Sequence, residues 1–243
     1  MSNKHKFHLR LRKTHRYLGV ILGIQFFFWT VGGLYFSWTN IDEVRGDNLR
    51  RETPLLSAKS ELVSPTLVLQ KLQNQSVMDS LISVQLIDIL GQLHYQIIYK
   101  VGKEKKTQLA HAQTGELRPA LAESEALSLA KSRLNVVAEM EKSEYLTTTN
   151  GHHEYREKPL PAYAFTFGAP ANTTVYIAAE LGTVQSFRNN QWRVFDFLWM
   201  LHVMDFESRD NINNWLLRAF SVFGLLTIFS GFILFFVSSK KFK

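Results

Sequence analysis

One histidine of this chain lies in surroundings where an ionisable ring is unusual. His202 falls within FDFLWMLHVMDF, residues 195–206, among aromatic, leucine and methionine side chains. An ionisable group in apolar surroundings is costly unless it has a partner, which makes His202 a candidate functional residue. The simpler interpretation is a histidine that is hydrogen-bonded to a carbonyl or to Asp205.

A second histidine, His15, heads a stripe of mostly small residues. At helical spacing, its face continues through Gly19, Gly23, Phe26, Thr30, Gly33 and Ser37. Gly19 and Gly23 also form a GxxxG motif, and small residues are enriched where membrane helices pack closely. Close packing therefore explains the glycines, but it does not explain an imidazole at the end of the stripe.

The other six histidines have simpler explanations. They occupy a basic tail, two expected strands and a polar loop: His5, His8, His94, His111, His152 and His153. The adjacent pair in the loop stands beside Glu154 and could bind a metal ion, but solvated loop side chains are the simpler interpretation. We therefore expect mutation of this pair to leave any bound cofactor unchanged.

Two long uncharged segments predict membrane-spanning helices. No charged residue occurs from Tyr17 to Asn40 or from Ala219 to Val237, and each segment is near the roughly 20 residues that cross a bilayer. The first is too long for the apolar part of a cleavable signal peptide, and it ends in bulky residues, so we expect a retained anchor. We assign residues 17–39 and 214–237 to the two transmembrane helices.

Basic residues concentrate at the two ends of the chain. Nine of the 28 lysines and arginines precede residue 17 or follow residue 239, which leaves 19 to face all 21 acidic residues. The positive-inside rule therefore places the tails, residues 1–16 and 238–243, in the cytoplasm. The net charge reflects topology and contact with anionic lipid, and it does not indicate nucleic-acid binding.

The chain contains no cysteine. This excludes disulfides, thiolate metal sites, iron–sulfur clusters and covalent c-type haem. A metal or redox centre here would need histidine, methionine, tyrosine or carboxylate ligands, or a bound cofactor.

Between the two spans, residues 40–190 predict a folded domain built from two similar units of helix and β-hairpin. Alternating apolar residues indicate strands in both halves, and a helix over Glu123 to Leu134 separates them. Matched strand tyrosines and turn glycines keep a nearly constant offset of 68 and 67 residues: Tyr95 with Tyr163, and Gly115 with Gly182. An internal duplication explains the offset, although β-hairpins also resemble one another by chance.

A further helix is predicted at residues 191–206, followed by a connecting loop at 207–213. Its charge-free part, Phe197 to Met204, is too short to cross a bilayer. We expect this helix to lie in the membrane–water interface on the outer side of the membrane that the two helices span, where aromatic side chains are favoured.

Three segments carry a resemblance to a known family. RKTHRYLGVILGIQFFFWTVGGLYFSW resembles the first helix of PepSY-associated transmembrane proteins, and the hairpins with turns at 112–115 and 179–182 resemble PepSY modules. FDFLWMLHVMDF, followed by a span that ends in SGFILFFVSSKK, resembles the closing segment of the short two-span members. The resemblance implies an α+β membrane protein in which two transmembrane helices flank an extracytoplasmic domain of tandem PepSY-like helix/β-hairpin units. It also implies a bacterial inner membrane, with both termini cytoplasmic and the domain periplasmic.

Some proteins of this broad family are haem-b ferric reductases in bacterial iron uptake. The resemblance thus implies haem b and a set of residues around it: His202 and His15 as axial ligands, with Trp199, Met204, Gly19 and Gly23 near the macrocycle. Ferric iron or a ferric chelate would accept the electrons. The donor would be a quinone or a partner protein, because no GxGxxG nucleotide fingerprint occurs.

The expected topology places the two histidines at different membrane levels. At the rise of an α-helix their levels differ by roughly 35 Å, so they cannot bind one iron unless the His202 helix dips deeply. A twofold homodimer would bring the same histidine from the second chain, and four helices make a bundle. We therefore expect a homodimer, with haem at the level of His202 in preference to that of His15.

The alternative is a PepSY binding or assembly protein without enzymatic activity, anchored by its two helices. It needs no cofactor. A protease or a transporter is disfavoured, because the sequence contains neither a nucleophile elbow nor HExxH and its spans carry no internal charge.

Overall fold

The computed structural model describes residues 3–57 and 59–239, which form two compact units. The membrane unit comprises residues 1–40 and 193–243, and the central domain comprises residues 41–192. The α+β class with two flanking spans, predicted from the sequence, is confirmed.

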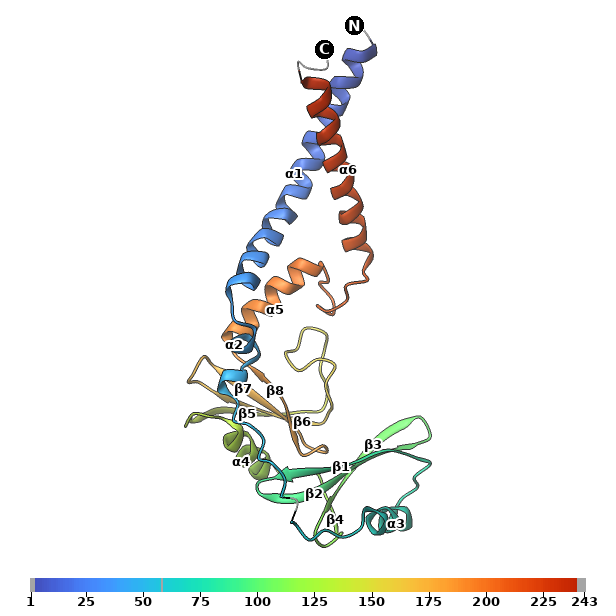
Figure 1. Cartoon of the computed structure of the whole chain (residues 1–243), viewed down its shortest axis with the longest axis vertical. Coiled ribbons are helices and arrows are strands. Elements are labelled where there is room, and N and C mark those ends of the chain that lie inside the picture. The colour runs from blue at the N-terminus through green and yellow to red at the C-terminus, as the bar shows by residue number, and fades with distance from the viewer. Residues whose placement is uncertain (1–2, 58, 240–243) are drawn as a thin grey trace. The chain divides into compact units, whose positions relative to one another are not determined.

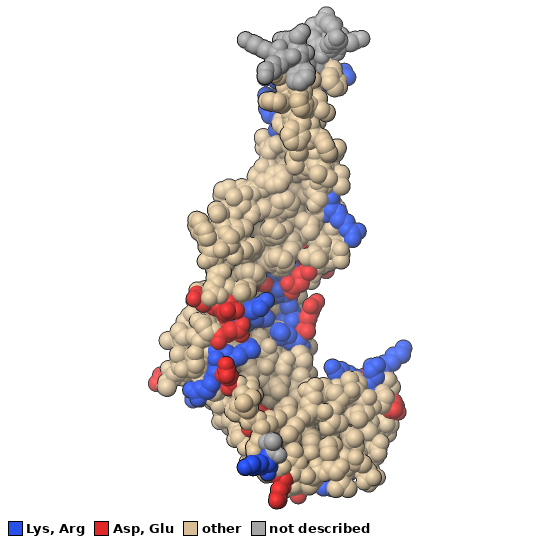
Figure 2. Space-filling model, in the orientation of Figure 1, with Lys and Arg blue, Asp and Glu red and all other residues tan. Residues whose placement is uncertain are grey.

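The membrane unit contains helices α1 (Asn3–Trp38), α6 (Trp215–Ser238) and most of α5 (Asn190–Val203). Two stretches, Leu9–Trp38 and Trp215–Ser238, are long and apolar enough to cross a membrane, with mean hydropathies of 1.6 and 2.4. Only 11% of the most apolar part of each is buried, unlike the core helix of a soluble protein. Figure 2 shows a surface that is almost free of charge along most of these helices, as a lipid-facing surface requires.

Helix α1 is longer than the predicted span. It already begins at Asn3, so the described part of the expected tail at 1–16 is helical. The physical reason is composition: residues 3–16 contain no proline or glycine and are rich in lysine, arginine and leucine, which are good helix formers. The side chains of His5 and His8 lie outside the described residues.

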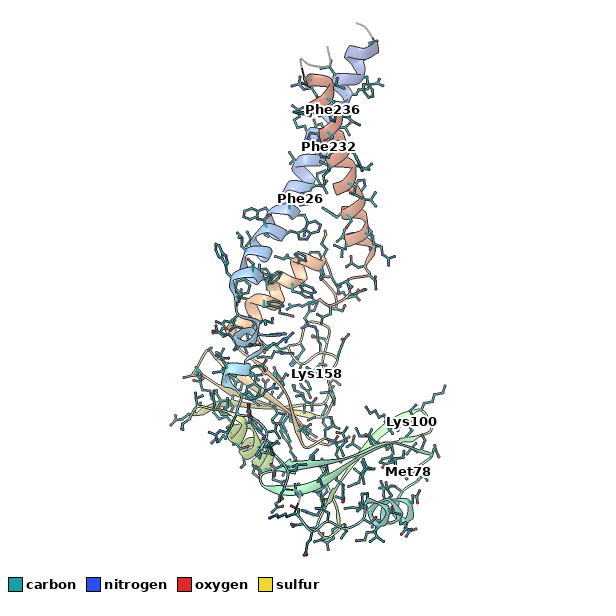
Figure 3. All side chains as sticks on the ribbon, in the orientation of Figure 1. Phe26, Met78, Lys100, Lys158, Phe232 and Phe236 are labelled. Atoms are coloured by element: carbon teal, nitrogen blue, oxygen red, sulfur yellow. The ribbon has the colours of Figure 1, made fainter. Side chains whose placement is uncertain are left out.

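One face of α1 is partly or fully buried against the other two helices of the membrane unit. The residues on this face are spaced alternately by three and four, as in a coiled-coil seam, and they are His15, Leu18, Leu22, Gln25, Trp29, Gly32 and Phe36. Helices α1 and α6 lie together near the chain ends and diverge away from them, where α5 lies beside α1 (Figure 1). Phenylalanines such as Phe232 and Phe236 cover the outside of α6 (Figure 3).

The central domain consists of two antiparallel sheets, each in strand order along the chain. The first follows α3 (Pro65–Gln75) and contains β1 (Ser80–Ile89), β2 (Gln92–Val101), β3 (Glu104–His111) and β4 (Leu117–Arg118). The second follows α4 (Glu123–Arg133) and contains β5 (Met140–Leu146), β6 (Ala162–Phe167), β7 (Thr173–Ala178) and β8 (Thr183–Arg188). Two short helices precede both sheets, α2 (Ile41–Arg45) and η1 (Asp47–Leu49).

The two halves repeat one plan, in which a helix precedes four antiparallel strands. Tyr95 and Tyr163 both lie on the second strand of their sheet. Gly115 and Gly182 both lie in the turn after the third strand, with φ of 69° and 66°, a conformation that favours glycine. The constant offset in the sequence therefore corresponds to equivalent structural positions, as a duplication predicts.

The two sheets are joined at the turn that contains Gly182. A Cβ atom at this glycine would lie 2.7 Å from Ile89 Cδ1 and 3.2 Å from Leu109 Cδ1, both in the first sheet. Gln96 Nε2 also donates a hydrogen bond to the Leu181 carbonyl at 2.6 Å. Because Ile89 and Leu109 belong to the same buried cluster as the residues of the second sheet, the two repeats share a core.

Candidate functional site

His15 lies in the seam between α1 and α6. Its Nδ1 atom is 2.7 Å from Ser230 Oγ, and the Ser230 hydroxyl itself lies 2.7 Å from the Thr227 carbonyl. A carbonyl can only accept, so the serine donates to Thr227 and accepts from His15. Nδ1 of His15 therefore carries a proton, and in the neutral ring this leaves the lone pair of Nε2 available.

The small residues that admit His15 belong to α6. A Cβ atom at Gly231 would lie 3.3 Å from His15 Cε1, and one at Gly224 would lie 3.7 Å from Phe26 Cζ. A Cβ at Gly19, Gly23 or Gly33 would instead meet nothing within 4 Å. Within this chain the GxxxG motif of α1 is therefore not a packing contact, and it faces open space beside His15.

A basic groove of about 570 Å³ adjoins His15. Its lining includes the side chains of Arg12, Lys13 and Arg16, together with the apolar Leu9 and Leu234. The groove combines three positive charges with an apolar wall, so it suits an anionic group attached to an apolar body.

His202 lies in an aromatic cluster. Its ring centroid is 5.9 Å from those of Trp29 and Trp199 and 6.0 Å from that of Phe36. Trp199 stacks nearly parallel to the imidazole, with an interplanar angle of 11°. Among the described residues, His202 Nδ1 is buried without a hydrogen-bond partner. Its tautomer is therefore not fixed by a neighbour, and the hydrogen bond to Asp205 considered above is absent.

The loop after α5 is closed around Asp205 instead. The helix ends at Val203, and Met204 follows, buried and with a φ of 54°. Burial raises the pKa of Asp205, but hydrogen bonds from the Ser208 hydroxyl and from the backbone N–H groups of Asn211, Ser208 and Glu207 outweigh it and lower the pKa to about 2. The carboxylate is thus committed to the loop, which explains why it does not face His202.

The same loop is also tied to the helix that carries His202. Arg209 Nη1 lies 2.5 Å from Asp196 Oδ2, and the Asp196 side chain is buried. The two acidic residues that flank the His202 stretch therefore organise the connection between α5 and α6.

Helix α5 packs along the C-terminal half of α1, which corrects the expected separation of the two histidines. Gln25 Nε2 donates to the Leu201 carbonyl, and Trp29 Nε1 donates to the His202 carbonyl, both at 2.8 Å. Trp29 and Phe36, the two α1 side chains beside the His202 ring, are 14 and 21 residues from His15, which corresponds to about 21–32 Å of helix, less than the roughly 35 Å expected. Within one chain the two imidazoles still cannot share an iron atom.

The four histidines of the central domain have structural partners or lie on a loop. His94 and His111 lie on neighbouring strands, with ring centroids 4.6 Å apart and an angle of 44° between the rings. His153 Nδ1 accepts a hydrogen bond from the backbone N–H of Tyr155. Across residues 3–57 and 59–239, no group of three or more His, Cys, Asp or Glu side chains is arranged to hold a metal ion.

A family comparison agrees with this architecture. The model of the PepSY-associated TM region matches residues 1–237. The chain belongs to this family. It is thus a membrane-anchored PepSY protein, and the resemblance inferred from its first helix and hairpins is confirmed. Neither the curated proteins nor the solved structures include a significant match to this PepSY protein.

Sequence reasoning missed several residues around the two histidines. Ser230 and Gly231 on α6 contact His15, whereas Trp29 and Phe36 on α1 contact His202. One signal was available for Ser230, because a polar residue inside an apolar span usually has a partner within the protein. Periodicity on α1 alone could not identify which turn of α6 faces it.

Proposed function

We propose that this PepSY protein is an inner-membrane haem-b oxidoreductase that passes electrons to ferric iron or a ferric chelate at the periplasmic face. The observation that carries the proposal is the hydrogen-bonded state of His15. Metal-binding histidines almost always donate their second ring N–H to a neighbouring acceptor, which orients the ring and increases its basicity. His15 has this arrangement through Ser230.

Beyond the iron ligand itself, the surroundings of His15 also suit the propionates and the macrocycle of a haem. Arg12, Lys13 and Arg16 line the adjacent groove and would pair with the propionates. The open surface at Gly19 and Gly23 leaves room for the edge of a macrocycle. When bound, haem b supplies one-electron transfer, and its potential depends on the axial ligand and on the polarity around it.

His202 is the second candidate ligand. Its aromatic neighbours Trp29, Phe36 and Trp199 would exclude water from a cofactor, but no neighbour fixes its tautomer. The hydrogen bonds thus favour His15 as the better-prepared ligand, which reverses the order expected from the sequence.

A second copy of the chain would complete the coordination. Within one chain His202 lies too far away to serve as the opposite ligand of His15, so we propose a homodimer in which each copy contributes the same histidine. The exposed small-residue stripe that includes Gly19 and Gly23 begins next to His15, and small residues allow membrane helices to approach closely. A protein that is strictly monomeric yet binds stoichiometric haem would contradict this arrangement.

The orientation follows from the charges at the chain ends. By the positive-inside rule, the basic residues near both termini favour cytoplasmic tails and a periplasmic central domain. The electron donor would be a quinone or a partner protein.

The direct test is a visible spectrum of the purified protein and of two variants. We expect the wild type to show reduced-minus-oxidised bands of haem b and His15→Ala to lose them, because the substitution removes the iron ligand. The double variant His152→Ala/His153→Ala removes two imidazoles from a polar loop and should keep the full signal. An unchanged haem signal in His15→Ala would refute His15 as a ligand. A colourless wild type from haem-replete cells would favour the binding or assembly protein instead.

Ser230 provides a second, graded test. Ser230→Ala removes the acceptor for His15 Nδ1–H, so haem affinity should fall by about tenfold or more. The iron should also become easier to reduce, because a less basic imidazole stabilises Fe(III) less. Ser230→Thr retains the hydroxyl and should restore both properties. Equal potentials and affinities in all three proteins would show that Ser230 does not position the ligand.

A further inference from the structure

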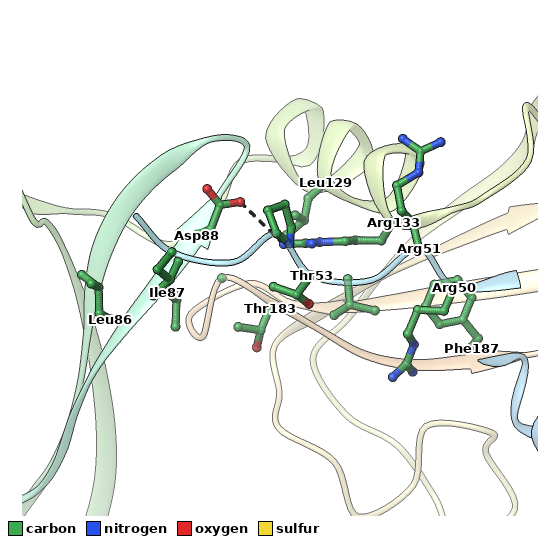
Figure 4. A pocket seen from close by; sticks show the side chains of 14 residues that line it. Arg50, Arg51, Thr53, Leu86, Ile87, Asp88, Leu129, Arg133, Thr183 and Phe187 are labelled. Carbon is green, nitrogen blue, oxygen red and sulfur yellow. Dashed lines mark ion pairs between the residues drawn. The ribbon is translucent and has the colours of Figure 1, made fainter. Parts of the chain in front are cut away.

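A pocket in the central domain is not used by the proposed membrane site. It has a volume of about 310 Å³ and lies between the segment 50–56, the end of α4 and strands of both sheets. This is near the lower limit of small-molecule sites. Figure 4 shows the Arg133 side chain reaching across it toward Asp88, with Thr53 and Thr183 beside it.

Arg133 is a buried cation with few close partners. Only 8% of the residue is exposed. Its Nη2 lies 3.6 Å from Asp88 Oδ1, and its Nη1 lies 3.5 Å from the Glu52 carbonyl, both long for hydrogen bonds. A guanidinium carries five N–H donors. Arg133 therefore retains donor capacity that faces the pocket.

The lining combines positive charge with an apolar wall. Arg50, Arg51 and Arg133 line the pocket together with one acidic residue, Asp88, while Arg50 is also 3.9 Å from Asp47 outside the lining. Apolar side chains form much of the remaining surface, and they include Leu56, Leu86, Ile87, Leu129, Val184 and Phe187. The pocket thus favours a ligand with an anionic end and an apolar body.

Backbone contacts fix the segment that lines the pocket at its start, near Arg50 and Arg51, whereas the rest of this segment is exposed to solvent. Arg51 N–H donates to the Arg133 carbonyl at 2.8 Å, and Arg50 forms a β-bridge with Leu134. Beyond this anchor the segment 51–57 is exposed, and Leu55 is 98% exposed. Because Leu55 does not pack against the domain, the segment 51–57 leaves the pocket accessible, and a ligand could enter beside it.

We propose that this pocket binds a small organic carboxylate with a short apolar body. A planar carboxylate matches the fork of the Arg133 guanidinium and can accept two parallel hydrogen bonds. The hydroxyls of Thr53 and Thr183 are additional donors at the pocket wall. The apolar residues favour a ligand with an apolar body over one that consists of charge alone, such as inorganic phosphate. This proposal is independent of haem and of the site at His15.

The test uses the full chain in nanodiscs of zwitterionic lipid and follows binding by ligand-observed NMR. The probe is 3-phenylpropionate, and 3-phenylpropionamide is the uncharged control with the same body. We expect saturable binding of the acid, no binding of the amide, and no competition by inorganic phosphate. Equal binding of acid and amide, or displacement of the acid by phosphate, would overturn the assignment of a carboxylate with an apolar body.

Two variants assign the binding to this pocket. Arg133→Gln should weaken the acid at least about tenfold, because it removes a charge-assisted hydrogen bond. Thr53→Trp places a large side chain in the pocket from the exposed segment and should also abolish binding. Because it removes no buried contact, it tests the location of the site even where Arg133→Gln disturbs folding. Lys142→Gln is the matched control, since it removes one positive charge from a side chain that is 62% exposed and outside the pocket. Unchanged affinity in Thr53→Trp, or a loss in Lys142→Gln equal to that in Arg133→Gln, would locate the binding elsewhere.

Discussion

In the central domain, His94 is fully buried, and both of its ring nitrogens have partners. Nδ1 lies 2.9 Å from the Gln92 carbonyl, and Nε2 lies 3.3 Å from Arg118 Nη1. The Gln92 carbonyl can only accept and the arginine can only donate, so Nδ1 carries a proton and Nε2 carries a lone pair, which is the neutral ring. The same argument that places a proton on Nδ1 of His15 thus fixes the tautomer of His94, but here no ring nitrogen remains free for a ligand.

His94 should make the stability of the protein depend on pH. Burial lowers its pKa below 6.5, the Gln92 carbonyl and Glu125 oppose this, and His111 and Arg118 lower it further. A lowered pKa in the folded state means that the stabilisation is complete above pH 6.5 and is lost as the pH falls through the folded-state pKa. The thermal midpoint should therefore fall when the pH is lowered below 6.5. His94→Gln should flatten this dependence, whereas His152→Gln on the exposed loop should leave it; identical profiles in all three proteins would exclude His94 as the cause.

At the scale of elements, the pairing of α1 with α6 depends on which glycines face a neighbour. Gly231 and Gly224 receive His15 and Phe26, while Gly19 and Gly23 face open space. Small residues on only one helix are sufficient here, because the facing positions of the other helix carry larger rings that fill the gap. The free glycine face of α1 remains available for the second copy in the proposed dimer.

This difference gives a matched pair of substitutions. Gly231→Leu should separate α1 from α6 and destabilise the membrane unit by about 1–3 kcal/mol, as overpacking does. Gly19→Leu meets no neighbour and should leave the unit as stable as the wild type, but it should shift the proposed dimer toward monomer. Unfolding in micelles, followed by tryptophan fluorescence, measures the first effect, and light scattering after size exclusion measures the second. Equal destabilisation by both substitutions would contradict the assignment of the packing face.

At the scale of the whole molecule, the central domain has its own core and its own closure. Its first and last elements are linked by Asn189 Nδ2, which donates to the Glu43 carbonyl at 2.8 Å. The two repeats are joined at the turn of Gly182, where first-sheet and second-sheet residues share one buried cluster. These contacts all lie within residues 41–192.

We therefore expect a fragment of residues 41–192 to fold as a soluble domain with one cooperative thermal transition. Gly182→Ala should destabilise it by about 1–3 kcal/mol more than Gly91→Ala. Both glycines have positive φ, so the backbone strain is similar, but only Gly182 also lies against Ile89 and Leu109. Circular dichroism and thermal unfolding measure the difference. Two separate transitions in the wild-type fragment would show that the repeats do not share a core.

The sequence by itself determined the features that depend on local pattern and length. Uncharged runs of sufficient length predicted both spans, and alternating apolar residues with a constant offset predicted two equivalent repeats. The turn glycines Gly115 and Gly182 were found for the same reason, since a tight turn after the third strand requires positive φ at one position in each repeat.

Only the tertiary structure decided which residues meet. Ser230 lies 215 positions from His15 along the chain, and Arg133 lies 45 positions from Asp88. No periodicity records such pairings, because they depend on how helices and sheets pack after they form. Because α5 packs along α1, His15 and His202 are closer than expected. The small residues at the contact between α1 and α6 come from α6 and not from the GxxxG motif of α1. The chemistry of both proposed sites therefore arises from contacts between distant segments. These contacts provide hydrogen-bond and ion-pair partners that helices and strands do not provide within themselves.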